Sequence, residues 1–160
     1  MDIPAILISQ YLAALEMLQQ TIAACPASIW NSADDQNKFW QVAYHALFFT
    51  HEYVSDSEEF ISPWRKHREG TEDFPAPPGE PYDQEAVLEF LAFCQQQVVE
   101  KVPKLNLEGP ERHGDGTLKE LELQIYALRH LMQHTGELME RLGARTGAEI
   151  EWVGWKHAGD

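Results

Sequence analysis

The sequence has little cysteine, few basic residues and no long apolar run. Two cysteines, Cys25 and Cys94, are too few for a disulfide framework or a zinc knuckle. Twelve basic residues against 26 acidic ones give a formal net charge of -14, which disfavours phosphate backbones and anionic lipids. No stretch approaches the roughly 18 apolar residues of a membrane-spanning helix, and the N-terminus lacks the basic segment of an export signal. We therefore expect a cytoplasmic protein that binds neither nucleic acid nor membranes.

The composition indicates one globular domain built of helices. A length of 160 residues, with 44% apolar and 24% charged residues, suits a single domain over 1–160. Apolar residues recur at three- and four-residue spacing, and no strand-like alternation competes with this pattern. The spacing predicts four helices, at about residues 3–24, 36–60, 83–102 and 118–142. The expected fold is therefore an all-α four-helix bundle.

Local signals predict several helix ends and two irregular segments. Asp2 can cap the first helix, and Pro4 suits its first turn. Thr117 and Glu120 form an expected capping box for the last helix, and Gly143 is its expected end. Residues 61–82 contain five prolines and are expected to form a long loop. The aromatic tail, 149–160, is expected to pack across the bundle or against a partner subunit.

Three histidines carry the chemical interest of the chain. His130 and His134 are one helical turn apart, so both imidazoles lie on one face of the predicted last helix and can bind one metal ion. His45 lies in the middle of the most aromatic predicted helix, where an unsatisfied polar group is costly. It is therefore either a hydrogen-bonded core histidine or a third metal ligand that faces the other two. Serine-hydrolase, phosphate-loop and Rossmann motifs are absent from the sequence.

The arrangement resembles the DinB/YfiT-like metalloenzyme family, in which one histidine of the second helix and an H-x-x-x-H pair of the fourth hold a metal ion. Trp40 followed by His45 matches the first motif. The string His130-Leu-Met-Gln-His134-Thr-Gly-Glu-Leu138 is similar to the family pattern H-x-x-x-H-x-G-x-L. The Trp152-Val-Gly-Trp155 tail also looks like the family's end. The resemblance covers about residues 3–143 and implies a bundle of the DinB type.

By this resemblance, His45, His130 and His134 are the metal ligands. Three histidines leave a coordination position open for water or substrate, and imidazole suits zinc, nickel and iron alike. The implied function is metal-dependent transfer or hydrolysis on a small molecule, with a low-molecular-weight thiol such as bacillithiol or mycothiol as a candidate cosubstrate. A homodimer is also implied. No catalytic residue is assigned, and the alternative is a non-catalytic metal-binding or assembly protein.

Several other residues are weaker candidates for the site. His51 is the rival ligand on the second helix, but it points about 120° away from His45 and lacks the spacing from Trp40. Glu52 and Glu137 are candidates to orient ligands or to act as bases, against a simpler role as solvated surface residues. The basic segment 64–68 is interpreted either as a solvated loop or as a lid that captures an anionic substrate. His67, His113 and His157 are expected to be solvated, and the two cysteines to be buried and unreactive.

Overall fold

The computed structural model describes residues 1–56, 62–74, 79–113 and 116–159, and this part of the chain is all-helical. It contains five α-helices and one short 3-10 helix: α1 (Ile3–Ala24), α2 (Ala27–Trp30), α3 (Phe39–Val54), α4 (Gln84–Lys101), η1 (Val102–Lys104) and α5 (Glu120–Thr146). Within the described ranges, β-type pairing is limited to an isolated bridge between Pro110 and Lys119. The prediction of an all-α fold is confirmed.

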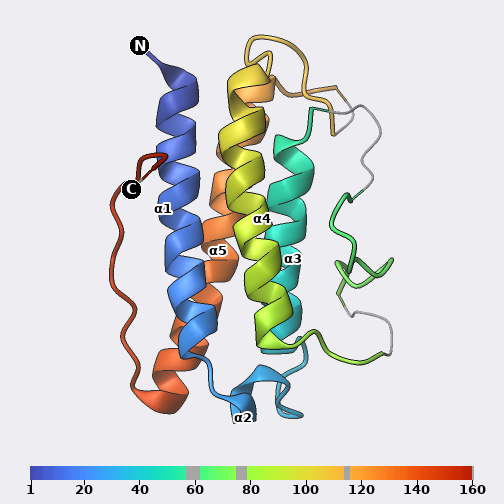
Figure 1. Cartoon of the computed structure of the whole chain (residues 1–160), viewed down its shortest axis with the longest axis vertical. Coiled ribbons are helices and arrows are strands. Elements are labelled where there is room, and N and C mark those ends of the chain that lie inside the picture. Colours follow the sequence, from blue (N-terminus) through green and yellow to red (C-terminus); the bar gives the residue numbers. More distant parts are fainter. Residues whose placement is uncertain (57–61, 75–78, 114–115, 160) are drawn as a thin grey trace.

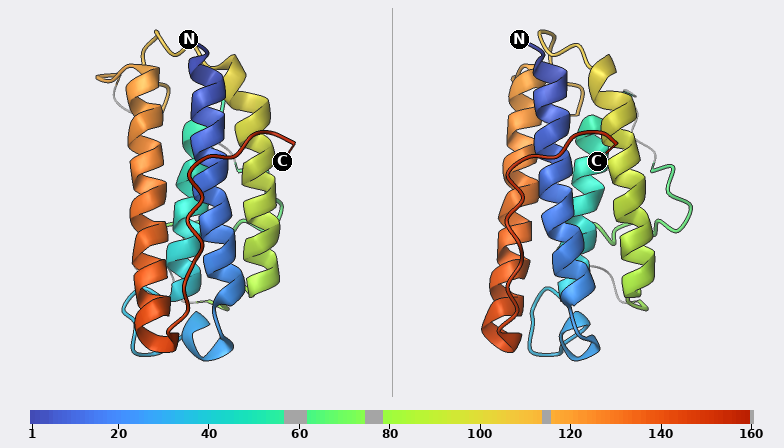
Figure 2. Two further views of the ribbon diagram at one scale, coloured as in Figure 1. Left: turned by 90° about the vertical axis from the view of Figure 1, so that its left-hand side faces the viewer. Right: turned by 60° about the vertical axis from the view of Figure 1, so that its left-hand side comes forward.

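The four longer helices lie side by side, and α2 sits beneath them as a short cap (Figure 1). Helices α1 and α5 run in one direction, and α3 and α4 run in the other (Figures 1 and 2). The packed neighbours are α3 with α5, α1 with α4, α1 with α5, and α3 with α4. Because α3 and α4 are parallel, the chain between them must return along the whole helix length, which explains the long segment predicted at 61–82.

Helices α1 and α4 begin where the sequence indicates, because local side chains cap them. Asp2 Oδ1 accepts a hydrogen bond from the Ala5 amide at 3.1 Å, and a proline occupies the first turn of α1. Asp83 Oδ1 does the same for Ala86 at 2.7 Å in α4. The predicted range 3–24 is confirmed, and 83–102 differs by one residue at each end.

Helix α3 is shorter than the predicted range 36–60. The backbone at residues 31–38 turns instead, because the Lys38 ammonium binds the carbonyls of Ser32 at 2.9 Å and Asp35 at 2.6 Å, and Gln41 Oε1 accepts from the Lys38 amide at 2.7 Å. The helix ends at Val54, since Ser55 is already extended, and the predicted residues 57–60 lie outside the described part. Helix α2 was also not predicted, because four residues are too few for a periodic signal.

Helix α5 is displaced from the predicted range 118–142, and the expected capping box is wrong. The first residue is Glu120, whose amide donates to the Gly109 carbonyl at 3.0 Å, so the loop that leads into the helix satisfies its first amide. Gly143 remains helical, and the helix ends at Thr146. The next residue, Gly147, has a φ of 73° and donates its amide to the Gly143 carbonyl at 2.8 Å. Only glycine adopts this left-handed backbone without strain.

After α5 ends, the C-terminal tail turns back and runs along α1 (Figure 2). Gln10 Nε2 donates to the Gly154 carbonyl at 3.2 Å, and Lys156 pairs with Glu16 at 2.7 Å. Trp152 and Trp155 nevertheless remain 73% and 70% exposed. Of the two expected positions for the tail, packing against the chain's own helices is observed.

An aromatic core lies between α3, α4 and the long segment that joins them. Tyr44 stacks on Tyr82 at 4.8 Å between ring centroids, and Trp64 stacks on Phe90 at 4.5 Å. All four side chains are buried. The segment at 62–74 and 79–82 is therefore anchored to the helices, which fixes its position beside the middle of α3. Across the described ranges, the helices all lack the combination of length and apolar character that crossing a membrane requires.

Candidate metal centre

The structure brings His45, His130 and His134 together between α3 and α5. His45 comes from α3, and the other two come from one face of α5, the antiparallel neighbour of α3. One ligand atom from each residue lies within 4.8 Å of the other two. The Nε2 atom of His130 is 3.1 Å from the Nε2 atoms of both His45 and His134. The three rings meet edge to face, and the ring nitrogens of His45 and His134 both lie against that of His130.

The spacing of these nitrogens fits a divalent ion. Zinc binds imidazole at about 2.0–2.1 Å, so two ligand nitrogens are about 2.9 Å apart at a right angle and about 3.3 Å apart at the tetrahedral angle. The observed 3.1 Å lies between these values. Three neutral imidazole donors are also a chemically suitable set for zinc, nickel or iron.

Hydrogen bonds on the far side of two rings determine where their protons lie. His45 Nδ1 donates to the carbonyl of Glu72 at 2.6 Å, and His134 Nδ1 donates to Glu137 Oε2 at 3.3 Å, because neither oxygen can act as a donor. A neutral imidazole carries one N–H, so both Nε2 atoms hold lone pairs toward His130. An N–H on His130 Nε2 can be donated to only one of them. The shared space therefore contains more lone pairs than protons, as a cation site requires.

Burial favours the neutral imidazole form of His45 and His130. Desolvation is the main cause that lowers the pKa of His45, although the hydrogen bond to Glu72 opposes it. Desolvation, followed by the neighbouring His134 and His45, lowers the pKa of His130 to about 4. Histidine binds metal as the neutral imidazole, so these ligands need not lose a proton at neutral pH.

Aromatic rings pack against the histidines, and two cavities lie near them. Phe49 lies against His45 and His130, and Phe74 stacks on His45 with 4.3 Å between ring centroids. A cavity of about 730 Å³ shares Phe49 and Glu72 with the surroundings of the cluster, although none of the three histidines lines it. The rest of its lining includes Phe48, Glu52, Asp73 and Arg112. A second cavity, of about 410 Å³, includes His130 in its wall. Both volumes are suitable for a small molecule.

Comparison with known proteins adds no relative, so a functional assignment depends on the geometry of the histidine cluster. No family model, curated protein or solved structure matches the chain. The resemblance to the DinB/YfiT-like family therefore depends on its two motifs, and membership stays a prediction. Both motifs are at the histidine cluster, since Trp40 and His45 belong to α3 and the string 130–138 belongs to α5.

The rival ligand His51 faces a different part of the molecule. Its side chain is buried against α4, with the ring centroid 5.1 Å from that of Phe93 and 6.4 Å from that of Phe90. These contacts support the prediction from helical geometry that His51 and His45 point in different directions. Glu52 lines the larger cavity, and desolvation, followed by the charge of Glu72, raises the pKa of its carboxyl.

The basic segment 64–68 contacts its own chain. Lys66 pairs with Glu89, and Arg68 donates to the Glu80 carbonyl while its guanidinium lies 3.8 Å from the centre of the Tyr82 ring. These contacts favour a structural role for the segment over a lid. His67, expected to be solvated, is half-buried, with its Nδ1 within 2.5 Å of the Tyr44 hydroxyl.

Both cysteines are buried, as expected, and burial raises the thiol pKa of Cys25 to about 12 and that of Cys94 well above its usual value. Sequence reasoning missed two partners of the site. The Glu72 carbonyl is a backbone acceptor, which leaves no signal in the side-chain pattern. Arg141 binds Glu137 at 2.6 Å, and its four-residue spacing from Glu137 was the available signal.

Proposed function

We propose that this chain is a DinB-like metalloprotein that binds one divalent ion through His45, His130 and His134 and acts as a metal-dependent enzyme on a small molecule. The observation that carries the proposal is the grouping of three histidines in which the Nε2 atoms of His45 and His134 each lie 3.1 Å from Nε2 of His130. Hydrogen bonds on the far side of the His45 and His134 rings turn their Nε2 lone pairs inward. Zinc, nickel and iron are the candidate ions.

The arrangement of the helices supports a four-helix bundle of the DinB type. The four longer helices pack as a ring of neighbours, and the three ligands come from the second and the last of them. This is the helix order in which the family pattern has its histidines. Like family membership, the assignment of bundle type is part of the proposal.

The surroundings of the site support a reaction on a small molecule. When bound, a divalent ion held by three histidines supplies Lewis-acid activation of water or of a thiol. Phe49 and Phe74 pack against His45, and Glu52 can hold or release a proton in the cavity that Phe49 lines. Thiol-dependent S-transfer is the favoured reaction and hydrolysis is the second. The cavity of about 410 Å³ that His130 lines is the first candidate for the substrate space, and the cavity of about 730 Å³ that Phe49 and Glu52 line is the second.

The alternative is a non-catalytic metal-binding or assembly protein, and one observation favours it. Trp152 and Trp155 remain largely exposed although the tail around them is bound to α1. Exposed tryptophans are enriched at protein interfaces, which also supports the expected homodimer. Light scattering of the wild-type chain and of a Trp152→Ser, Trp155→Ser variant tests this role. A monomeric wild type contradicts the assembly interpretation.

Metal analysis tests the central proposal. Protein purified without a nickel column, or stripped with chelator and reloaded with zinc, is expected to bind about one divalent ion per chain. His130→Ala removes one of three ligands and is expected to abolish stoichiometric binding, whereas His157→Ala, at an exposed tail position, leaves it unchanged. Circular dichroism establishes that each variant is folded. Wild-type protein that binds no ion after reloading overturns the proposal.

Activity distinguishes the enzyme from the binding protein. Purified holoprotein is assayed with a panel of low-molecular-weight thiols and electrophilic acceptors, and with esters and amides for hydrolysis. The enzyme interpretation expects turnover that is lost with chelator, restored by the ion, and absent from His130→Ala. Stoichiometric metal binding without turnover in any assay supports the non-catalytic alternative instead.

A further inference from the structure

A chain of charged contacts extends away from His134 along one face of α5. Glu137 Oε2 accepts from His134 Nδ1 at 3.3 Å, and Glu137 Oε1 accepts from Arg141 Nη2 at 2.6 Å. Arg141 Nη1 then donates to the Asn37 carbonyl at 2.8 Å. The spacing of three and then four residues keeps these side chains on one stripe of the helix. One carboxylate thus bridges a histidine and an arginine.

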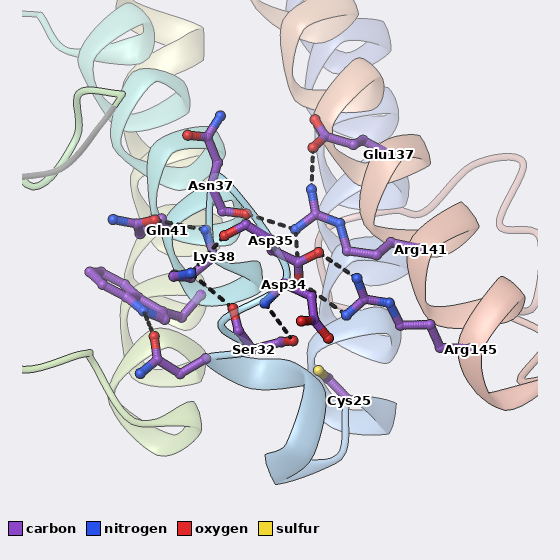
Figure 3. A network of polar contacts seen from close by, with 12 residues as sticks. Cys25, Ser32, Asp34, Asp35, Asn37, Lys38, Gln41, Glu137, Arg141 and Arg145 are labelled. Atoms are coloured by element: carbon purple, nitrogen blue, oxygen red, sulfur yellow. Dashed lines mark hydrogen bonds and ion pairs between the residues drawn. The ribbon is translucent and has the colours of Figure 1, made fainter.

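The far end of this chain is fixed by the loop between α2 and α3. Figure 3 shows the guanidinium groups of Arg141 and Arg145 reaching from α5 toward Asp35. Arg145 Nη1 donates to Asp35 Oδ2 at 3.1 Å, and Arg141 Nη1 lies 3.6 Å from the same oxygen. The Asp35 side chain is only 8% exposed and that of Arg141 is 16% exposed, so water screens these contacts less than it screens a surface ion pair.

The buried contacts of Arg141 restrain the more exposed side chain of Glu137. The Glu137 side chain is 41% exposed, and an isolated glutamate of that exposure samples several rotamers. The more buried Arg141, itself bound to Asn37 and Asp35, restrains one carboxylate oxygen of Glu137. The other oxygen is consequently directed at His134 Nδ1.

We propose that Glu137, Arg141 and Asp35 form a positioning relay that holds His134 in its Nδ1–H tautomer, so that its Nε2 lone pair faces the metal site. The relay rests on the proposed function of His134 as a ligand. Neither Arg141 nor Asp35 touches the site, and both act through Glu137. If the relay operates, the loop residues Asp35 and Asn37, which hold Arg141, influence how tightly the site binds a metal ion.

Glu137→Gln is the most informative substitution, because it keeps the size of the side chain and removes one of its two acceptors. Arg141 continues to require the remaining oxygen, so the amide NH2 group, which can only donate, faces His134 Nδ1. His134 must then accept at Nδ1 and carry its proton on Nε2, where the metal would bind. Adding Arg141→Met frees the amide to rotate and to offer its oxygen to His134 again.

Two measurements follow the relay separately. Long-range proton–nitrogen NMR spectra of the metal-free protein report which ring nitrogen of His134 carries the proton. We expect Nδ1–H in the wild type, Nε2–H in Glu137→Gln, and a return toward Nδ1–H in the double variant. Competition with a chelating dye measures zinc affinity, which is expected to fall roughly 10–100-fold in Glu137→Gln and to recover in part in the double variant. Glu140→Gln, the same change at an exposed position of α5, is the matched control.

The outcomes separate the relay from the proposed metal function. An unchanged His134 tautomer in Glu137→Gln overturns the relay, even where the protein binds zinc. A tautomer that switches but is not restored by Arg141→Met overturns the part assigned to Arg141 and Asp35. A protein that shows the switch and its restoration but binds no zinc supports the relay and overturns the proposed function.

Discussion

Replacing His51 with glutamine tests how a buried neutral imidazole couples the stability of this protein to pH. Desolvation is the main cause that lowers the pKa of His51 to about 4, and the positive charges of Lys101 and His113 act in the same direction. The side chain is 3% exposed and packs edge-on against Phe93. An unfolded chain binds a proton at this residue near pH 6.5, whereas the folded chain does so only near pH 4.

The sign of the effect follows from this difference. The folded pKa lies below the unfolded one, so the contribution of His51 is complete above about pH 6.5 and is lost as the pH falls toward 4. One unit of pKa corresponds to about 1.36 kcal/mol, which gives a total loss of roughly 3 kcal/mol. Between pH 7 and pH 5 the linkage relation gives a loss of about 2 kcal/mol.

Urea unfolding at pH 7 and at pH 5, with chelator present to exclude metal binding, measures this loss. The wild type is expected to lose about 2 kcal/mol more than His51→Gln over this interval, whatever the variant's stability at pH 7. His157→Gln, which changes an exposed histidine, should retain the wild-type pH dependence. Equal losses in the wild type and in His51→Gln would refute the reasoning, because the imidazole would then titrate alike in the folded and unfolded chains.

Three further changes have expected outcomes. Gly136→Ala places a methyl group where no heavy atom lies within 4 Å, so it should raise the free energy of unfolding by about 0.5–1 kcal/mol; a lower melting temperature contradicts this. Gly147→Ala forces a side chain into a backbone with a φ of 73° and should cost about 1–2 kcal/mol in urea unfolding, which a neutral result would exclude. Zinc at a hundredfold excess over its Kd should stabilise the wild type by about 2.7 kcal/mol, and calorimetry should find no such gain in His130→Ala.

The parts of the fold that the sequence predicted correctly are those controlled by neighbouring residues. Helix α1 matches the predicted range because Asp2 and Pro4 act within its first turn. The start of α5 was wrong because its first amide donates to Gly109, and the start of α3 was wrong because the Lys38 ammonium binds two carbonyls of the preceding loop. Such contacts depend on how the chain returns to itself, and no local pattern encodes them.

Within the candidate site, too, local patterns predicted some residues and missed others. The facing positions of His45, His130 and His134 follow from helical periodicity, which relates residues on one face whatever the loops do. Glu137 was a candidate for the same reason. Asp35 was not, because its contact with Arg145 joins the loop before α3 to the end of α5, and an aspartate in a loop has no periodic signal.

The two hydrogen bonds behind the histidines differ in the kind of sequence change that can break them. The acceptor for His45 is the main-chain carbonyl of Glu72, which every amino acid supplies, so single substitutions at that position leave it intact. Insertions or deletions that shift the segment before α4 are the changes that remove it. The acceptor for His134 is the Glu137 side chain, so one codon change removes it. The orientation of His45 therefore depends on the length of the segment before α4, and that of His134 depends on the identity of residue 137.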